Sequence, residues 1–381
     1  MKNNKIVIFI AGYLPAKKYG GPVTSIANFV EVMGDEWNIF IVSHDHDYND
    51  TNRLPGIKVG WNQVGKAKVL YLSENKFTQE TFSEIIDNLS PAIMYASSIF
   101  SAKINLPLLS ISKQKNIPIL LAPRGELNSS ALRRKKYKKA VYLLFLKLTN
   151  KLSNVYFQAT SLDERLNIIN SLSVVQEKVF LLPNVPVAMK QKVNINKEKG
   201  KAKICYVGRI VPNKNLDYAI KTVQKATCNV EFDIFGPNAD KLYWDKCKEM
   251  ISKSPSNIKI RYKGLLSSFE INEVYSRYDC LISPTLFENY GQAIVESMLH
   301  DTPVIISEGT TPWDSISKFK AGYVIPLDKQ NDFTNAVDKI GHMGNNEYLK
   351  LIENLRNYCI FTFNFEELKA KYNDAFKIII G

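Results

Sequence analysis

Residues Leu281–Trp313 follow a pattern that belongs to one kind of fold. A short apolar run ends at Pro284, a polar loop follows, and the segment Gln292–Leu299 repeats apolar residues near helical spacing. A second apolar run, Thr302–Ile306, closes the stretch. This order predicts a strand, a loop, a helix and a strand, which is one βαβ unit of a parallel sheet. The chain is therefore expected to be an α/β protein.

The start of the predicted helix has the features of an anion site. Gly291 stands where the loop becomes the helix, and free N–H groups and the positive end of the helix dipole meet there. Glu288 in the loop and Glu296 in the helix flank this point. An anion site edged by carboxylates suits a ligand with both phosphates and hydroxyls, such as a nucleotide sugar. A helix with incidental surface glutamates is the alternative.

Length and composition limit the class of protein. The 381 residues predict two domains, and the apolar share of 45% excludes a disordered chain. No apolar run reaches about 18 residues, so no transmembrane helix is expected. The N-terminal residues Met1–Pro15 read as a buried first strand rather than a signal peptide. Five cysteines without a CxxC pair argue against a zinc site or a disulfide framework and fit a reducing cytoplasm.

The net charge of +13 predicts an anionic partner. The densest basic cluster is Arg133–Lys139, and the apolar segment AVYLLFLKL follows at once. A basic turn that runs into an apolar helix, here over residues 133–148, is typical of a segment that lies on an anionic membrane surface. A solvated basic loop before a core helix is the alternative. Nucleic-acid binding is less favoured, because no zinc-finger, RNP-type or helix-turn-helix signature accompanies the charge.

Strands and helices are predicted to alternate through residues 1–186, which indicates a doubly wound α/β domain. The expected strands are Lys5–Ile10, Trp37–Val42, Lys68–Leu72, Ala92–Ala96, Pro118–Ala122, Val155–Ala159 and Val179–Leu182. The expected helices are Thr24–Met33, Phe77–Leu89, Leu106–Lys115 and Asp163–Ser171. Such sheets bind ligands at the carboxyl ends of their strands. Gly20-Gly21, after the first strand, and Arg124 and Glu126, after a later one, stand at such ends.

The charged residues 187–201 are expected to be a linker, and residues 202–364 repeat the α/β pattern. The expected elements include strands at Lys203–Val207, Glu231–Phe235, Ile258–Tyr262 and Gly322–Ile325, and helices at Leu216–Ala226, Ser268–Arg277, Asp332–Gly341 and Glu347–Tyr358. Two similar domains predict a cleft that the carboxyl ends of both sheets face. In the loop after Lys203–Val207, Arg209 and Lys214 can converge on one pyrophosphate, or they are incidental surface cations.

Five segments, spread over nearly the whole chain, carry a resemblance to a known family. They are Gly20-Gly21, GRIVPNK (Gly208–Lys214), FGP (Phe235–Pro237), FENYGQAIVES (Phe287–Ser297) and DTPVIIS (Asp301–Ser307). Together they resemble the retaining family-4 glycosyltransferases with the GT-B fold. The ENYG, TPW and APRGEL stretches look like bacterial enzymes that build capsule, O-antigen or exopolysaccharide. The resemblance implies two Rossmann-like domains that face each other across a cleft, with the helix at 365–381 packing back on the first domain.

The resemblance also implies a role for each candidate residue. Arg209 and Lys214 would hold the donor diphosphate and neutralise the departing nucleotide. Glu288 would bind hydroxyls of the donor sugar, and Glu296 would bind the ribose. Backbone or loop positions would complete the donor site, with Gly21 near the diphosphate, Leu265 at the base, and the N–H groups of Tyr290, Gly291 and Gln292 at the sugar and phosphate.

No DxD motif stands at a strand end, so the resemblance implies a metal-independent enzyme without a cofactor. The donor would be a UDP- or GDP-type nucleotide sugar. Many relatives have a histidine at the end of a middle strand in the first domain, whereas this chain has LLAPRGEL there. Part of that acceptor-side role is assigned to Arg124 or Glu126. A structural pair between these two residues is the alternative.

The leading hypothesis is a retaining glycosyltransferase that moves a sugar from a nucleotide diphosphate to a glycan, expected to be lipid-linked, in bacterial surface polysaccharide synthesis. It would work in the cytoplasm or at the inner face of the cell membrane. One alternative is a GT-B enzyme with a small soluble acceptor, or a nucleotide-sugar epimerase. A second alternative is a non-enzymatic protein that binds nucleic acid or another polyanion.

Overall fold

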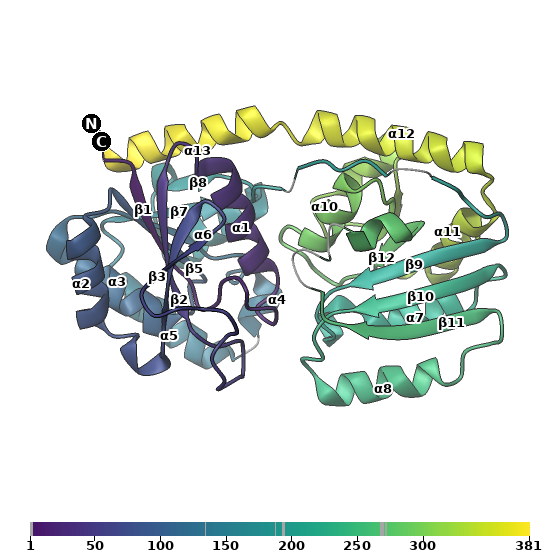
Figure 1. The fold of residues 1–381 in the computed structure, drawn as a ribbon, viewed down its shortest axis with the longest axis horizontal. Coiled ribbons are helices and arrows are strands. Elements are labelled where there is room, and N and C mark those ends of the chain that lie inside the picture. The colour runs from purple at the N-terminus through teal and green to yellow at the C-terminus, as the bar shows by residue number, and fades with distance from the viewer. Residues whose placement is uncertain (1–2, 134, 187, 193–194, 267–269, 271–272) are drawn as a thin grey trace. The chain divides into compact units, whose positions relative to one another are not determined.

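The computed structural model describes residues 3–133, 135–186, 188–192, 195–266, 270 and 273–381. The chain divides into two compact units (Figure 1). Unit 1 contains Met1–Val185 and the C-terminal segment Phe365–Gly381, and unit 2 contains Pro186–Asn364. Both units are α/β, so the predicted class of two Rossmann-like domains is confirmed. No helix in the described ranges is both long and apolar enough to span a membrane.

Unit 1 is built on an eight-stranded sheet with the order β3-β4-β2-β1-β5-β6-β7-β8. The strands are β1 (Lys5–Phe9), β2 (Asn38–His44), β3 (Trp61–Val64), β4 (Ala67–Leu72), β5 (Ile93–Ser97), β6 (Ile119–Ala122), β7 (Val155–Ala159) and β8 (Val179–Leu181). All neighbouring strands are parallel except β3, which pairs antiparallel with β4 at one edge. The central strands β1 and β5 are apolar almost throughout because helices cover both faces of the sheet.

Helices form a layer on each face of this sheet. They are α1 (Gly21–Met33), α2 (Gln79–Leu89), α3 (Ala102–Lys115), α4 (Ser129–Arg133), α5 (Lys136–Leu148), α6 (Leu162–Leu172) and α13 (Phe365–Ile380), with 3-10 turns at Glu74–Lys76 and Gln176–Lys178. One buried cluster holds side chains of α1 and α13, and a second holds side chains of α2, α3, α5 and α6. Helices α1 to α6 come from the N-terminal part of the chain, whereas α13 is the last helix of the chain.

The C-terminal helix α13 is part of unit 1 by its contacts. Phe376 packs against the rings of Phe29 and Trp37, with ring centroids 6.2 and 5.0 Å away. The indole N–H of Trp37 also donates to Asn373 Oδ1 over 2.8 Å. These contacts join the first helix of the chain to the last one. The helix therefore closes the core of a unit that the N-terminal residues begin.

Unit 2 has a six-stranded, wholly parallel sheet with the order β11-β10-β9-β12-β13-β14. Its strands are β9 (Lys201–Val207), β10 (Asn229–Phe235), β11 (Ile258–Gly264), β12 (Cys280–Ser283), β13 (Val304–Ser307) and β14 (Tyr323–Ile325). Its helices are α7 (Leu216–Gln224), α8 (Lys241–Ile251), α10 (Gln292–Leu299), α11 (Gln330–His342) and α12 (Asn345–Thr362), with 3-10 turns at Pro212–Lys214, Tyr275–Arg277 and Asp314–Phe319.

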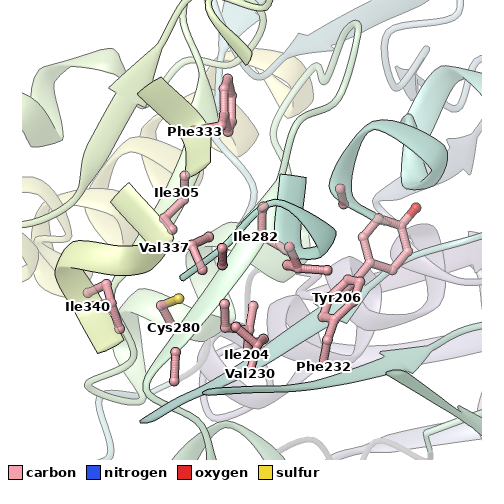
Figure 2. Close-up of a cluster of buried hydrophobic side chains, with 14 of the residues drawn as sticks. Ile204, Tyr206, Val230, Phe232, Cys280, Ile282, Ile305, Phe333, Val337 and Ile340 are labelled. Carbon is pink, nitrogen blue, oxygen red and sulfur yellow. The ribbon is translucent and has the colours of Figure 1, made fainter. Parts of the chain in front are cut away.

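One buried cluster of unit 2 lies between its sheet and helices that include α11, and a second contains side chains of α10 and α12. Figure 2 shows side chains of β9, β10, β12 and β13 that gather against Phe333, Val337 and Ile340 of α11. These helix residues follow the three- and four-residue spacing of one helical face, which is why the segment folds as a helix over the sheet. The same sheet holds the candidate site at the carboxyl ends of its strands.

The structure differs from the sequence expectations at the linker and at two elements that were not expected. The described part of the expected linker 187–201 belongs to unit 2 rather than standing between domains, and Lys197 shows why. Its side chain is fully buried, and its ammonium donates to the carbonyl of Glu198 and lies 3.4 Å from the carboxylate of Asp279. Strand β3 and helix α8 were not predicted. The expected helix Ser268–Arg277 lies partly outside the described residues. Of those that are described, Glu270, Glu273 and Val274 are helical, as expected, and Tyr275–Arg277 form a 3-10 turn.

Candidate active site

The centre of the candidate site is the first turn of α10. Gly291 caps this helix with φ 74° and ψ 61°, a left-handed conformation that glycine adopts without strain. No side chain in the described ranges caps the helix. The first bonds inside the helix run from the N–H groups of Ile294 and Val295 to the carbonyl of Gly291, so the amides of Gln292 and Ala293 remain available. The helix start therefore has the expected form, and anion binding there stays a prediction.

Glu296 lies one turn into α10 and is 3% exposed. Gln292 donates to its carboxylate over 3.1 Å, and the hydroxyl of Tyr275 donates over 3.3 Å. Burial raises the pKa of Glu296 to about 7, because these two neutral donors offset only part of the cost of a buried charge. Each oxygen of this carboxylate thus accepts from one neutral side chain, Oε1 from Gln292 and Oε2 from Tyr275. Tyr275 was not predicted from the sequence, because nothing in its own segment links it to α10.

Lys214 and Glu288 form an ion pair with each other. Lys214 ends the 3-10 turn Pro212–Lys214, and Glu288 lies in the loop between β12 and α10. Burial, and secondly the positive charge of Arg209, lower the pKa of Lys214, whereas the adjacent carboxylate favours its charged form. The structure thus brings together two predicted residues that the sequence places in separate loops.

Backbone and amide contacts hold these two loops together. The N–H of Leu286 donates to the carbonyl of Asn213 over 3.0 Å, and the Asn213 side chain donates to the carbonyl of Phe287 over 3.2 Å. The hydroxyl of Thr285 donates to the same Asn213 carbonyl, and the side chain of Asn215 donates to the carbonyl of Pro284. Both ion-pair partners therefore stand on two loops that hydrogen bonds join to each other.

Arg209 lies beside this pair and has an exposed side chain. It forms no ion pair with any other described residue. Its loop is fixed through two glycines, since Gly236 has φ 135° and an added Cβ there would lie 1.9 Å from the carbonyl oxygen of Gly208. The N–H of Gly208 donates to Phe235 and that of Ile210 to Pro237, over 3.0 and 2.9 Å. This close approach explains the glycines of the GRIVPNK and FGP segments.

Two aromatic residues, Tyr290 and Trp313, pack against each other next to the start of α10. Tyr290 is buried, and the indole of Trp313 lies edge-on to its ring at 5.3 Å and donates to its carbonyl oxygen. The N–H of Glu288 donates to the carbonyl of Thr310 over 2.8 Å. The TPW segment and the preceding Thr310 thus hold the loop that carries Glu288 and Tyr290. Leu265 is half-buried and directly follows Gly264, the last residue of β11.

Three predicted residues belong to unit 1. Gly21 is the first residue of α1 and is exposed, and Gly20 before it caps the helix with φ 72°. The guanidinium of Arg124 donates to Asn184 and to the hydroxyl of Tyr95, the latter over 3.0 Å. The arrangement ties the end of β6 to the end of β5 and to the segment after β8. It gives Arg124 a structural role in the fold.

Glu126 has partners of its own. Its carboxylate accepts from the hydroxyl of Ser98 over 2.7 Å and from the N–H of Ile99 over 2.8 Å. Burial raises its pKa, although these donors favour the charged form. Arg124 and Glu126, both described, make no ion pair with each other, so the predicted structural pair between them is absent. Each residue instead braces a different loop.

His44, His46 and Glu74 of unit 1 are the side chains in the described ranges that could hold a metal ion. One ligand atom from each lies within 4.8 Å of the others. Burial lowers the pKa of His44 to about 4, which keeps its imidazole neutral, the form that binds metals. The carboxylate of Glu74 is already paired with Lys103. None of these side chains is among the candidate donor residues.

Part of the chain matches a known protein family. Residues 188–358 match the family model described as Glycosyl transferases group 1. The chain is 25% identical over 211 residues to an uncharacterised 41.2 kDa protein in the cps region of Klebsiella pneumoniae, covering 54% of this chain and 56% of that protein. It is also 25% identical over 187 residues to the capsular polysaccharide biosynthesis glycosyltransferase CapM of Staphylococcus aureus, covering 46% of each. The matches thus span about half the length of these relatives.

Among solved structures, Anabaena HepE in complex with UDP and glucose superposes with a TM-score of 0.74 at 12% sequence identity. The superposition covers 98% of this chain and 99% of that one, and at such low identity it shows the fold alone. The matched family segment contains Arg209, Lys214, Glu288 and Glu296. The chain therefore has the GT-B fold, and its residues 188–358 match the model of the group 1 glycosyltransferases.

Proposed function

We propose that the protein is a retaining glycosyltransferase that moves a sugar from a UDP- or GDP-type nucleotide diphosphate to a glycan. The observation that carries this proposal is the grouping around the first turn of α10. Arg209 and Lys214 bring positive charge, the helix start offers free amides, and Glu288 and Glu296 offer hydroxyl acceptors. In a nucleotide sugar, the phosphates need the cations and the free amides, and the hydroxyls of the sugar and the ribose need the carboxylates.

The chemistry of sugar transfer explains the cations. As the bond from the anomeric carbon to the diphosphate breaks, negative charge builds up on the leaving nucleotide. Arg209 presents a forked donor, Lys214 presents a point charge, and the free amides of α10 add the positive end of the helix. Groups that are already in place around a developing charge lower the barrier most. Here the two loops that hydrogen bonds join hold these groups in place. The proposal needs neither a metal ion nor a cofactor.

The carboxylates take separate parts in the proposal. Glu296 is buried, and we place it at the ribose, whose hydroxyls would donate to the lone pairs that its two neutral donors do not use. Glu288 pairs with Lys214, and we place it at the hydroxyls of the donor sugar. When a diphosphate draws Lys214 towards itself, the Glu288 carboxylate gains free acceptor positions. Binding the phosphate would therefore prepare the sugar site.

The acceptor in this proposal is a lipid-linked glycan of a bacterial surface polysaccharide. Two observations support it: the similarity to CapM, named for capsular polysaccharide biosynthesis, and the similarity to a protein of the Klebsiella cps region. Retention of configuration follows from the resemblance to family-4 enzymes. The reaction would take place in the cytoplasm, at the inner face of the cell membrane.

The test is nucleotide release from UDP- and GDP-sugars, measured with a crude lipid-linked glycan fraction as acceptor. Arg209→Ala and Glu288→Gln are each expected to lower turnover by about 100-fold or more, the usual effect of removing one preorganised group. Glu249→Gln, an exposed carboxylate on α8, is the matched control and should leave turnover unchanged. Unchanged turnover in both site variants would contradict the assignment. Conversion of the donor sugar without transfer would indicate an epimerase.

A further inference from the structure

Helix α5 of unit 1 exposes a continuous apolar stripe. The exposed fractions of its outward side chains are large, at 84% for Tyr137, 68% for Val141, 54% for Leu144, 40% for Phe145 and 76% for Leu148. Their spacing of three and four residues puts all five on one face of the helix. Single exposed apolar residues are common on proteins, but a stripe along a whole helix marks an interaction surface.

The opposite face of α5 is already used by the fold. Leu143 and Leu146 are 9% and 1% exposed and belong to the buried cluster under this side of the sheet. The helix therefore has two apolar faces, and the core of unit 1 accounts for one of them. A helix that needed only to pack on its own unit would carry polar residues on the second face. The five outward side chains must therefore serve another contact.

Positive charge surrounds the stripe. The exposed side chains of Lys136, Lys138 and Lys147 are spaced along α5, and Arg133 and Lys135 precede it. From residue 127 to residue 162 the chain contains eight Lys or Arg residues and no Asp or Glu. An apolar stripe with cationic edges and no acidic residue fits a surface that is apolar inside and anionic outside.

This charge pattern selects one occupant. A second copy of the chain would bring the same cations against themselves, because a two-fold contact pairs a surface with itself. A nucleic acid would use the cations but leave the aliphatic stripe unexplained. An anionic bilayer satisfies both features, since apolar side chains enter the acyl boundary while lysine stems reach back to the lipid phosphates.

We propose that α5 docks unit 1 on an anionic lipid bilayer, lying in the plane of the interface with its stripe inserted. Tyr137 would sit at the level of the headgroups, where aromatic residues with a polar end are favoured. The exposed cations would bind the phosphates of anionic lipids, which attract basic segments next to a membrane. The inference goes beyond the proposed function and uses none of the donor residues.

The experiment is co-sedimentation of the full chain with vesicles of phosphatidylcholine alone or mixed with phosphatidylglycerol. Wild type is expected to bind the mixed vesicles at low salt and to be released by high salt. Val141→Ser with Leu148→Ser, and separately Lys136→Glu with Lys138→Glu, should each lower the partition coefficient by about tenfold or more. Leu242→Ser is the matched control, because Leu242 is equally apolar and 84% exposed on α8 of unit 2.

The outcomes separate this proposal from the donor site. All four substituted positions are exposed, so circular dichroism and the melting temperature should match wild type, and donor hydrolysis in the absence of lipid should be unchanged. Equal binding of wild type and both α5 variants would overturn the proposal, as would equal binding to neutral and anionic vesicles. Absence of vesicle binding together with self-association that the serine variants abolish would also overturn it, in favour of a second copy.

Discussion

The ammonium of Lys214 is paired with the carboxylate of Glu288 across two loops that four further hydrogen bonds join. A group proposed to hold phosphate is thus held by a group proposed to hold sugar. A nucleotide sugar carries a phosphate for Lys214 and hydroxyls for Glu288, so its contacts can replace the ion pair between these two residues. A free sugar has no phosphate and cannot replace the contact that Lys214 would lose. In the proposed function, the pair would therefore favour ligands that bring a diphosphate.

Lys214→Met should weaken binding of UDP or GDP by about tenfold to 100-fold, the usual value of a charge-assisted hydrogen bond. Binding of the corresponding monophosphates should weaken less, because they place less charge at the site. Isothermal titration calorimetry measures both. Lys248→Met, on the exposed face of α8 and paired with Asp245, is the matched control.

The same variant leaves the Glu288 carboxylate without its cation. Adding Glu288→Gln to Lys214→Met should therefore restore part of the lost stability without restoring nucleotide affinity, because a neutral amide costs less to bury than an unpaired charge. If the single and double variants bind UDP or GDP as tightly as wild type, Lys214 does not contact the diphosphate.

Glu296 should make stability fall as pH rises. Its folded pKa of about 7 lies above its ordinary value of 4.5, so the folded state favours the protonated carboxyl. The contribution is fully present below pH 4.5 and is lost as pH rises to about 7, a difference of about 3 kcal/mol. Urea unfolding at several pH values should show this decline in wild type and a flatter profile in Glu296→Gln. If the free energy of unfolding changes with pH in the same way in both proteins, the claim that the fold favours the protonated form of Glu296 is wrong.

Gly236→Ala should destabilise unit 2 strongly. The position has φ 135°, and the new Cβ would lie 1.9 Å from the carbonyl oxygen of Gly208, which is backbone and cannot rotate away. We expect a loss of about 3 kcal/mol or more in the free energy of unfolding, with loss of donor turnover. Gly344→Ala is the control, because that residue has an ordinary φ and no atom within 4 Å of an added Cβ. A stable, active Gly236→Ala protein would show that the two loops do not need this approach.

Removal of metal ions should not change turnover. Arg209, Lys214 and the start of α10 supply the positive charge in the proposal, and the ligand-type group of His44, His46 and Glu74 lies in unit 1. Turnover after dialysis against EDTA should equal that before, and His46→Ala should behave the same way. A loss of turnover that magnesium or manganese restores would contradict the proposal.

The sequence predicted most where the local pattern is strong. The bounds of α10 agree with the expected Gln292–Leu299, because a glycine start defines that helix. The bounds of α13 agree with the expected helix at 365–381 to within one residue, because its helical spacing is clear. Strand β3 was missed because it is four residues long, lies at the sheet edge and has no buried residue. Helix α8 was missed because its apolar residues are interrupted by charged ones.

Contacts between segments that are distant in the sequence could not be predicted. Nothing in the loop of Lys214 shows that it meets Glu288, and nothing near Tyr275 shows that it donates to Glu296. Likewise, Arg124 was predicted from its place after a strand, but its partners Tyr95 and Asn184 come from other parts of the chain. Residue type and spacing identified the candidates, while the parallel sheets determined which of them meet.

The central claim is that the start of α10 and its charged neighbours bind a nucleotide diphosphate sugar. The most direct measurement is a thermal-shift panel of UDP- and GDP-sugars on wild type, Arg209→Ala and Glu296→Gln. A ligand at about 100 times its Kd stabilises the folded state by about 2.7 kcal/mol, enough for a clear rise in Tm. At least one nucleotide sugar should raise the Tm of wild type and leave both variants unshifted. If no nucleotide sugar shifts wild type, or all three proteins shift equally, the claim is wrong.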